Sequence, residues 1–465
     1  MSSIFQAQKS KSISLRNEKY KDRLNKVLKI KSWIKLNRSS IKEALYADFK
    51  KPSAEVDITE IIPVLEAIRE IKANLKRWMM PRPVPVTLLM VGTSSHIRYE
   101  PKGVTLIIAP WNFPFNLVVE PLAHALAAGN TAILKPSEIT PATSTLISKM
   151  VSELFMEEDV AVFEGGPDVS NQLLKFPFDH IFFTGSPRIG KIVMKAAAEN
   201  LASVTLELGG KSPAIIDQSA DIKDAAIKIA FGKFINNGQT CIAPDYILIH
   251  RSLEHKFLAS LKEMVVKLFD GEKKGIQNSP DYARMITSQH ASRSQALIED
   301  SLATGAKVEF GENNLPEERY ISPTLLSGVD KNAKVMKEEI FGPILPVIAY
   351  DNLEEAIEEI NNKEKPLALY IFSRNKKPIN QILKSTSSGT VCINDTVIHF
   401  AHSKLPFGGV NHSGFGKAHG RYGFLAFSNQ KPVLKQRVGF TVFRPLYPPY
   451  NKRVNKILDW VIKFI

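Results

Sequence analysis

The sequence predicts an α/β protein with two doubly wound series of strands and helices. Short apolar runs bounded by turn residues recur along the chain, and stretches with helical periodicity separate them. Strands that alternate with helices favour parallel sheets with right-handed crossovers. The chain has 465 residues, 44% hydrophobic and 23% charged, which is enough for roughly two or three domains with substantial cores.

The first hundred residues predict helices followed by an extended arm. Apolar residues at helical spacing predict one helix over 18–49 and a second over about 54–78. Prolines at every second position over 81–85 then exclude a helix, because each removes a backbone donor and restricts its neighbour. We therefore expect an extended arm over about 80–100.

Two series of strands follow the arm. The first is predicted as strands over 104–109, 131–135, 160–164, 180–185 and 204–208, joined by helices near 118–128, from about 141, near 168–175 and over 188–200. The second is predicted as helices over 221–236 and near 253–268, with strands over 246–250, 344–349, 368–372 and 390–393. Five strands joined by helices in the first series predict one parallel sheet.

The formal net charge of +14 is concentrated at the two ends of the chain. Residues 1–38 carry eleven Lys or Arg against two acidic residues, and residues 446–465 have a net charge of +3. Solvated helical faces are the favoured interpretation, and attraction to anionic lipid or, less favoured, to nucleic acid is the alternative. Zinc-finger spacing and aromatic RNA-binding signatures are absent from the sequence, so we expect no nucleic-acid partner and no metal site.

The final residues predict an amphipathic helix. Val454, Ile457, Leu458, Val461 and Ile465 share one helical face, and the opposite face is mostly cationic. The segment is too short to span a bilayer. Docking on the protein's own core or on a partner subunit, and peripheral contact with a membrane surface, are equally favoured.

Cysteine content indicates a reducing compartment. Cys241 and Cys392 are the only cysteines and cannot form a disulfide framework. The first residues lack the apolar region of a secretion signal, and no apolar run reaches the roughly 20 residues of a membrane span. A cytoplasmic location is therefore expected.

Three residues stand at turns where a side chain can act on a substrate. Cys241 lies in the polar turn NNGQTCIAPD, although a lone cysteine is more often inert packing. Glu207 ends a predicted strand and can serve as a general base, although a solvated surface acid is commoner. Asn112, between Pro110 and Pro114, can donate to an oxyanion, although such residues are usually turn formers.

A glycine-containing turn is a candidate nucleotide site. FFTGSPRIG (182–190) places Gly185 and Ser186 between a strand and a helix, with Gly190 in the first helical turn. That pattern suits the approach of a pyrophosphate to a helix N-terminus. It is not a strict G-x-G-x-x-G, and an ordinary strand-to-helix turn is an equal interpretation.

Together these segments resemble the aldehyde dehydrogenase superfamily over nearly the whole chain. The resemblance rests on the blocks APWNFPFN, AILKPSE, FFTGSPRIG, LELGGKSP, FINNGQTCIAPD, EEIFGPILP and LPFGGVNHSGFG. FDHIFFTGS, RYGFLAFSNQK and YPPY make the sequence most similar to the class 3 and fatty aldehyde dehydrogenase group. Asn411 and Ala418 depart from the family pattern near the substrate entrance, where Gly and an aromatic residue are usual.

The resemblance implies NAD(P)-dependent oxidation of medium- to long-chain aliphatic or aromatic aldehydes to carboxylic acids. Cys241 matches the nucleophile that forms a thiohemiacetal and then a thioester. Glu207 matches the base that activates water for thioester hydrolysis. Asn112 and the Cys241 backbone N–H match the donors to the oxyanion. Cys392 falls on a core strand of the family, which implies packing.

The resemblance also implies an NAD or NADP site. The matching residues are Trp111, Lys135, Glu138, Gly185, Ser186, Gly190, Glu339 and Phe341. Lys135 matches the lysine on the adenosine ribose, and Glu138 lies where a 2′-hydroxyl is distinguished from a 2′-phosphate. The class 3 group often accepts both cofactors, so the preference stays open. The three residues of the glycine turn match the pyrophosphate site, and Glu339 and Phe341 match the nicotinamide site.

By the same resemblance, the domains follow a family pattern. We expect a cofactor-binding domain over 1–79 and 101–207, a catalytic domain over 208–424, bridging segments over 80–100 and 425–445 that join a homodimer, and a tail over 446–465. Two other functions remain: a thiol hydrolase or acyltransferase that uses Cys241 without redox chemistry, and a catalytically silent membrane-bound scaffold.

Overall fold

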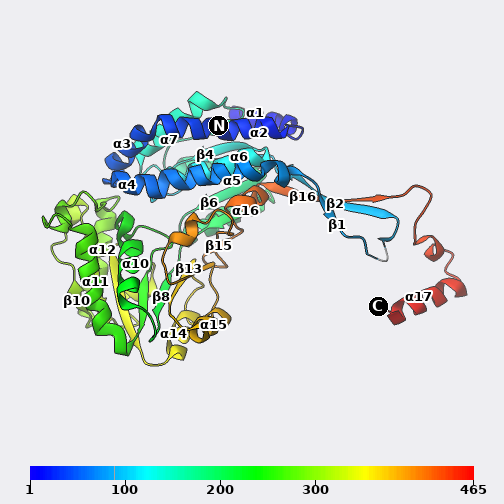
Figure 1. The fold of residues 1–465 in the computed structure, drawn as a ribbon. Coiled ribbons are helices and arrows are strands. Elements are labelled where there is room, and N and C mark those ends of the chain that lie inside the picture. The colour runs from blue at the N-terminus through cyan, green and yellow to red at the C-terminus, as the bar shows by residue number, and fades with distance from the viewer. Residues whose placement is uncertain (88–89, 465) are drawn as a thin grey trace.

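Three β-sheets organise the computed structural model, which describes residues 1–87 and 90–464 (Figure 1). The first sheet has the strand order β15-β7-β6-β3-β4-β5. Its strands are β3 Val104–Ile108, β4 Thr131–Lys135, β5 Val160–Val162, β6 His180–Thr184, β7 Ser203–Glu207 and β15 Gly414–Phe415. The first five are parallel, which confirms the predicted sheet, and β15 adds an antiparallel edge to β7.

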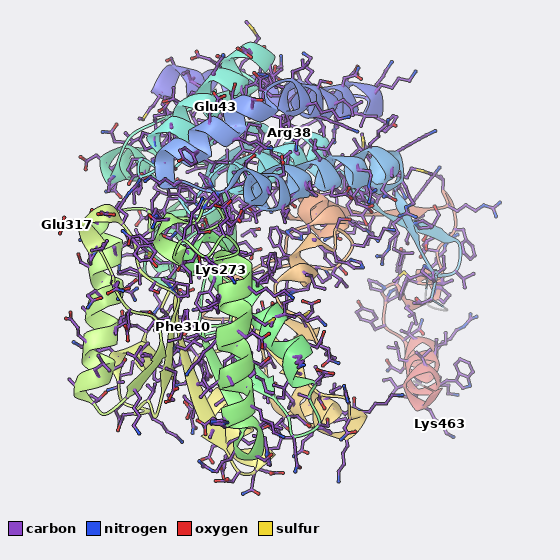
Figure 2. All side chains as sticks on the ribbon, turned by 60° about the vertical axis from the view of Figure 1, so that its left-hand side comes forward. Arg38, Glu43, Lys273, Phe310, Glu317 and Lys463 are labelled. Carbon is purple, nitrogen blue, oxygen red and sulfur yellow. The ribbon has the colours of Figure 1, made fainter. Side chains whose placement is uncertain are left out.

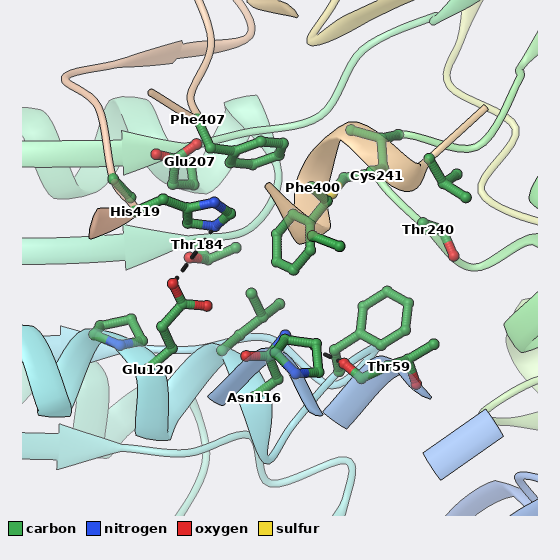
Figure 3. A pocket seen from close by; sticks show the side chains of 18 of the residues that line it. Thr59, Asn116, Glu120, Thr184, Glu207, Thr240, Cys241, Phe400, Phe407 and His419 are labelled. Carbon is green, nitrogen blue, oxygen red and sulfur yellow. Dashed lines mark hydrogen bonds and ion pairs between the residues drawn. The ribbon is translucent and has the colours of Figure 1, made fainter. Parts of the chain in front are cut away.

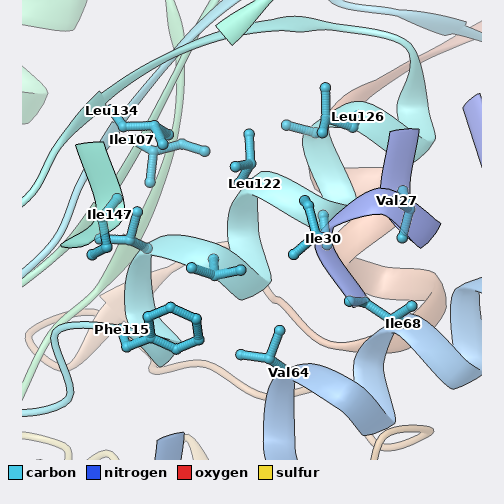
Figure 4. Close-up of a cluster of buried hydrophobic side chains, with 14 of the residues drawn as sticks. Val27, Ile30, Val64, Ile68, Ile107, Phe115, Leu122, Leu126, Leu134 and Ile147 are labelled. Atoms are coloured by element: carbon cyan, nitrogen blue, oxygen red, sulfur yellow. The ribbon is translucent and has the colours of Figure 1, made fainter. Parts of the chain in front are cut away.

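Helices cover both faces of this sheet, as the doubly wound class requires. One face carries α2 Tyr20–Leu36, α3 Arg38–Phe49, α5 Ile62–Met79, α6 Asn116–Ala128 and α7 Pro141–Leu154. Figure 4 shows Phe115, Leu122 and Leu126 packed between the sheet residue Ile107 and the N-terminal helices. The other face carries α1 Ser2–Leu15, α8 Pro167–Leu173 and α9 Pro187–Glu199.

A short π-helix interrupts the second predicted helix. The short helix α4 (Ser53–Val56) leads into π-helical residues Asp57–Ile61, which continue directly into α5. Single π-helical turns occur frequently at functional sites, because the extra residue re-aims the side chains around it.

The second sheet has seven strands in the order β10-β11-β12-β9-β8-β13-β14. They are β8 Pro213–Ile216, β9 Tyr246–His250, β10 Lys307–Phe310, β11 Thr324–Ser327, β12 Ile344–Tyr350, β13 Ala368–Phe372 and β14 Thr390–Ile393. All are parallel except the edge pair β10–β11. The structure thus confirms a second α/β series, and adds β8, β10 and β11 to the predicted strands.

Helices also cover both faces of the second sheet. One core includes α10 Ile222–Phe234 and α11 Glu254–Phe269, and the other includes α12 Ser288–Ala303, α14 Leu353–Asn361 and α15 Lys376–Ser385. The short helices α13 (Lys334–Lys337) and α16 (Gly420–Ala426) lie in connecting segments.

A three-stranded antiparallel sheet projects from the body (Figure 1). It consists of β1 Arg82–Val84, β2 Thr93–Pro101 and β16 Ser428–Gln436. β2 and β16 pair over nine residues, from Pro101 opposite Ser428 to Thr93 opposite Gln436. The predicted extended arm is therefore a β-hairpin closed by a late strand; its residues 88 and 89 lie outside the described part.

The C-terminal segment forms helix α17 (Lys452–Phe464) beyond this small sheet. Figure 2 shows α17, with Lys463, set apart from the two large sheets. Val454 is buried, whereas Leu458 and Ile462 are exposed. The predicted member of the apolar face at Ile465 lies outside the described residues. Within residues 1–87 and 90–464, no helix combines the length and apolar character needed to cross a membrane.

Candidate active site

The carboxyl ends of four parallel strands meet at one edge of the first sheet. The strand order reverses between β3 and β6, since β4 and β5 lie on one side and β6 and β7 on the other. Ligands of open α/β sheets bind in the crevice outside such a switch point. Trp111 and Asn112 follow β3, Lys135 ends β4, Gly185 follows β6 and Glu207 ends β7. The fold therefore collects five predicted site residues at one crevice.

Cys241 lies in a tight loop between α10 and β9. Asn236, Asn237 and Gly238 have φ angles of 51°, 56° and 72°, in the left-handed region that Asn and Gly tolerate best. A Cβ on Gly238 would lie 2.3 Å from the carbonyl oxygen of Gly342. The Asn-Asn-Gly run thus turns the chain sharply and allows the cysteine loop to lie directly against the segment that follows Glu339.

Buried side-chain amides hold this loop in place. Asn236 Nδ2 donates to the backbone carbonyls of Asn112 at 2.9 Å and Gln239 at 3.0 Å. Asn237 Nδ2 donates to the Ala283 carbonyl at 2.9 Å, and Gln239 Nε2 donates to the Asn236 carbonyl at 2.9 Å. The polar residues before the cysteine therefore fix the loop backbone, and Cys241 itself is half-buried.

Asn112 lies beside the cysteine loop and is only 2% exposed. Its Nδ2 donates to the Gln239 carbonyl at 3.2 Å. A side-chain amide nitrogen carries two hydrogens, so one remains for a second acceptor. Asn112 is thus placed to donate a hydrogen bond near Cys241 while its position is fixed by the loop.

A buried charged cluster connects both loops to the N-terminal helices. Lys51 Nζ lies 2.9 Å from Glu60 Oε1, and both side chains are fully buried. Glu60 Oε2 accepts a hydrogen bond from the Asn116 N–H at 2.9 Å, and Glu55 Oε1 accepts one from the Asn236 N–H at 2.8 Å. No pattern in the sequence predicted this cluster, which connects α4 and the π-helix to the start of α6 and to the cysteine loop.

Burial dominates the electrostatics of the cluster. It raises the pKa of Glu55 to about 7 and raises that of Glu60, while Lys51 opposes both shifts. Removing one partner of a buried ion pair typically destabilises a protein by about 3–5 kcal/mol, because a charge is left uncompensated. The cluster therefore acts as an anchor whose parts depend on one another.

Cys241 faces a cavity but is poorly poised for ionisation in the free protein. Burial, followed by the nearby Glu339 and Glu207, raises the pKa of the thiol to about 12. The backbone N–H groups of Cys241 and Ile242 lower it only partly. Burial and the two nearby carboxylates therefore favour the thiol over the thiolate in the free protein.

Glu207 ends β7 and is 6% exposed. Neither of its carboxylate oxygens has a hydrogen-bond partner among the described residues. Burial raises its pKa well above the ordinary value, Lys417 lowers it, and Glu120 raises it further. A buried carboxyl group with a raised pKa and free oxygens can take a proton from a thiol or from water.

One cavity of about 200 Å³ contains both Cys241 and Glu207 in its lining (Figure 3). Most of its wall is apolar, with six phenylalanines: Phe113, Phe182, Phe231, Phe400, Phe407 and Phe427. Figure 3 shows Cys241 on one side and Glu120 with His419 on the other. A small apolar molecule in this cavity would meet a thiol and a free carboxyl group together.

The glycine turn lies at the exposed N-terminus of α9. Ser186 caps the helix and its Oγ accepts from the Ile189 N–H at 3.4 Å. A Cβ on Gly190 would lie 2.7 Å from Leu208, so only glycine lets α9 pack this closely on the chain after β7. Free N–H groups at a helix start bind phosphate well. The residues present therefore fit a pyrophosphate.

Lys135 and Glu138 form an ion pair at the end of β4. Lys135 Nζ lies 2.9 Å from Glu138 Oε2 and donates to the Pro136 carbonyl at 2.8 Å. The lysine is buried and the glutamate is partly exposed. An ammonium group with one remaining hydrogen beside a carboxylate fits the hydroxyls of a ribose.

Glu339, Phe341 and Trp111 complete the predicted cofactor set. The carboxylate of Glu339 packs so closely on Gly209 that a Cβ there would lie 2.3 Å from Oε2. Burial and then Asp245 raise the pKa of Glu339 to about 8. Phe341, with φ of 48°, contacts Trp111 edge to face with ring centres 5.3 Å apart. These residues lie at the crevice, outside the lining of the cavity.

None of the eight residues matched to a dinucleotide site lines the cavity that contains Cys241. Cys392 lies half-buried on β14 and packs against the second core, which agrees with a packing role. Across residues 1–87 and 90–464, no group of three or more His, Cys, Asp or Glu is arranged to hold a metal ion.

Comparisons with known proteins agree with this geometry. The family described as "Aldehyde dehydrogenase family" matches residues 2–433. The 4,4'-diaponeurosporen-aldehyde dehydrogenase of Staphylococcus aureus is 44% identical over 93% of this chain and 91% of its own. Aldehyde dehydrogenase family 3 member A2 of Mus musculus is 44% identical over 92% of this chain and 87% of its own.

Solved structures show the same fold. The substrate-bound state of Staphylococcus aureus AldH superposes with a TM-score of 0.94 at 41% identity, covering 99% of both chains. The NAD+ complex of a Bacillus cereus aldehyde dehydrogenase superposes with a TM-score of 0.83 at 28% identity, covering 93% of this chain and 88% of that one. The chain therefore belongs to the aldehyde dehydrogenase family and is an oxidoreductase that oxidises aldehydes with NAD+ or NADP+.

Proposed function

We propose that this enzyme oxidises medium- to long-chain aliphatic or aromatic aldehydes to carboxylic acids through a cysteine thiohemiacetal and thioester. The observation that carries the proposal is the aromatic cavity that holds Cys241 and Glu207 in one lining. An apolar aldehyde gains free energy when this wall removes its surface from water. The similarity to an enzyme named for a diaponeurosporen aldehyde supports a large apolar substrate.

The reaction starts when Cys241 attacks the aldehyde carbon. The thiol proton passes to solvent, and the sulfur attacks as the thiolate. The sulfur–carbon bond forms, and the carbonyl electron pair becomes an oxyanion. The free hydrogen on the Asn112 amide and the backbone N–H of Cys241 stabilise that charge; one such donor typically contributes about 10²–10³ in rate.

Oxidation and hydrolysis follow from the thiohemiacetal. When bound, the nicotinamide ring supplies the acceptor for the hydride that leaves the former aldehyde carbon. The remaining thioester carbon is then attacked by water, from which Glu207 removes a proton. Cleavage of the sulfur–carbon bond releases the carboxylic acid, and Glu207 returns the proton that it took from water to the Cys241 sulfur.

The cofactor residues are assigned roles by the same proposal. Gly185, Ser186 and Gly190 bind the pyrophosphate at the start of α9, and Lys135 binds the adenosine ribose. Glu138 sets the preference between NAD and NADP through its charge. Glu339 holds the nicotinamide ribose, and Phe341 with Trp111 borders the ring.

We assign the cofactor-binding domain to residues 1–79 and 101–207 and the catalytic domain to 208–424. Residues 80–100 and 425–445 bridge the subunits of a homodimer, a role supported by the projecting β2–β16 ladder. The enzyme acts in the cytoplasm, and the cationic tail over 446–465 makes peripheral contact with membranes. The exposed Leu458 and Ile462 support that contact.

A substrate panel tests the proposal. Purified enzyme is assayed with NAD+ and with NADP+ on aldehydes from acetaldehyde to hexadecanal and on benzaldehyde, by the absorbance of reduced cofactor. The kcat/KM is expected to rise with chain length, and Cys241→Ser is expected to abolish it. Release of acid from an ester without reduction of either cofactor would instead identify a non-redox thiol hydrolase.

A further inference from the structure

We infer that the cavity selects aldehydes that carry a hydroxyl group at the end remote from the carbonyl, and that Glu120 and His419 bind this hydroxyl. The inference rests on the proposed function, since it requires the aldehyde carbon to be held at Cys241. It names a substrate class that the apolar lining alone would not indicate.

Polar side chains gather on one wall of the otherwise apolar cavity. Glu120 and His124 come from α6, Thr184 ends β6, and His419 precedes α16. Figure 3 shows Glu120, Thr184 and His419 close together, with Cys241 on the far side. A molecule bound to the thiol at one end therefore extends toward this wall with its other end.

Glu120 and His419 face each other without a hydrogen bond. Glu120 Oε1 lies 3.6 Å from His419 Nε2, which is longer than a hydrogen bond between these atoms. The side chains are 8% and 6% exposed. The imidazole stacks on Phe407 with ring centres 5.0 Å apart and meets the edge of Phe400 at 4.6 Å. These contacts fix the imidazole ring, so His419 cannot move closer to Glu120 without disturbing both phenylalanines.

The protonation states of Glu120 and His419 favour a neutral polar group as the part of the substrate that binds between them. Burial raises the pKa of Glu120 to about 8 and lowers that of His419 to about 3. Near pH 7 the carboxyl group is therefore mostly protonated and can donate, while the imidazole is neutral. A hydroxyl can accept from the carboxyl group and donate to an imidazole nitrogen, so it satisfies both at once.

Two further groups on this wall lack partners. His124 Nδ1 lies 3.0 Å from the Glu120 backbone carbonyl, so Nδ1 carries the proton and Nε2 is a bare acceptor. Neither His124 Nε2 nor Thr184 Oγ1 has a hydrogen-bond partner in the described part of the chain. Buried polar groups are normally satisfied, so these orphaned atoms indicate a polar ligand.

The charge of the lining excludes other polar ends. The described lining residues include no Lys or Arg, and Glu207 and Glu120 share the cavity, so a terminal carboxylate would meet no positive charge. A terminal ammonium would be desolvated among phenylalanines and would require Glu120 to ionise. A hydrocarbon end would leave all four wall groups unpaired.

Matched substrate pairs test the inference. The kcat/KM of ω-hydroxy alkanals is compared with that of n-alkanals of equal length, and para-hydroxy with para-methyl benzaldehydes and cinnamaldehydes. At the length that spans the cavity, the hydroxyl partner is expected to be favoured by about 10- to 100-fold. Glu120→Leu is expected to reduce this ratio to about one, and Glu120→Gln, which retains a donor and an acceptor, to retain most of it.

The outcomes separate this inference from the proposed function. Turnover of the methyl partners with no preference for a hydroxyl at any length overturns the inference and leaves aldehyde oxidation standing. Equal slowing of both partners by Glu120→Leu, with the ratio intact, also overturns it, because Glu120 would then act on Glu207 instead. Absence of reduced cofactor with every aldehyde overturns both.

Discussion

The side-chain amide of Asn236 donates a hydrogen bond to the backbone carbonyl of Asn112 at 2.9 Å. This bond joins the loop after β3 in the first sheet to the cysteine loop of the second. Together with the hydrogen bond from Asn112 Nδ2 to the Gln239 carbonyl, it holds the loop of the proposed oxyanion donor against the loop of the proposed nucleophile. The Glu55 carboxylate also fixes Asn236, because its Oε1 accepts a hydrogen bond from the Asn236 backbone N–H at 2.8 Å.

Replacing Asn236 by Gly tests this contact without backbone strain. Glycine accepts the left-handed conformation, so the substitution removes only the side chain. We expect kcat to fall by about 10- to 100-fold, because small misplacements of reacting groups cost that much. Steady-state kinetics and far-UV circular dichroism measure the effect. A variant with normal kcat would show that the amide contact does not position the site.

Glu207→Gln is expected to separate oxidation from hydrolysis. The amide cannot take a proton from water, so a burst of reduced cofactor should precede a steady rate lowered by about 10²–10⁴. Rapid-mixing absorbance checks this. An unchanged steady rate would remove Glu207 from hydrolysis.

The pH dependence of kcat in the wild-type enzyme also tests Glu207 as the base for hydrolysis. Because burial raises the pKa of Glu207 well above its ordinary value, the carboxyl group is protonated at low pH and becomes a base only as pH rises. The kcat limited by hydrolysis should therefore still increase with pH above the ordinary pKa of a glutamate side chain. The slope should disappear in Glu207→Gln, which retains no titrating group at that position.

Alkylation measures the ionisation of Cys241. Its raised pKa, about 12, predicts slow reaction with iodoacetamide in the free enzyme at pH 7. Glu339→Gln removes a carboxylate that raises this pKa, so alkylation of the variant should be faster above pH 8, where the wild-type Glu339 is ionised. Peptide mass spectrometry distinguishes Cys241 from Cys392. Equal rates in variant and wild type would contradict the electrostatic account.

Glu138→Gln is expected to favour NADP+. The carboxylate pairs with Lys135 at 2.9 Å and repels a 2′-phosphate. Its removal frees the lysine for that phosphate, so the ratio of kcat/KM for NADP+ over NAD+ should rise by about tenfold or more. Thr145→Ala, on the following helix α7, is a matched control that should leave the ratio unchanged. A constant ratio in Glu138→Gln would place the discrimination elsewhere.

Deletion of residues 451–465 tests the proposed membrane contact. The truncated protein should lose its pelleting with vesicles that contain anionic phosphatidylserine, and the effect should weaken at high salt. Vesicles of neutral phosphatidylcholine provide the control. Pelleting that survives the deletion would assign the contact to the basic N-terminal helices.

Much of the fold was predictable because short apolar runs alternate with stretches of helical periodicity. The five parallel strands of the first sheet and an extended arm follow from the pattern of apolar residues and prolines, whereas the pairing of that arm into a hairpin does not. β8, β10 and β11 were not predicted, and their length of four residues is not the reason, since β14 is equally short and was predicted.

The residues of the proposed site that lie at strand ends could be predicted from the sequence. The residues that reach the cavity from inside a buried helix could not. Glu207 and Asn112 stand at turns that the pattern exposes. Glu120 and His124, by contrast, lie four residues apart inside α6, whose residues are buried almost throughout. Charged and imidazole groups inside an apolar helix were a usable signal, but only the tertiary packing shows that they face the cavity.

The charged anchor of Lys51, Glu55 and Glu60 has a consequence for how the protein acquires activity. It joins a segment made early in synthesis to loops that belong to both large sheets, so the thiol, the carboxyl group and the amide come into register only after the halves have docked. A chain in which the two large sheets have not packed together should be inactive. Local disruption of the Lys51, Glu55 and Glu60 cluster should therefore abolish activity while nearly all the helical content is retained.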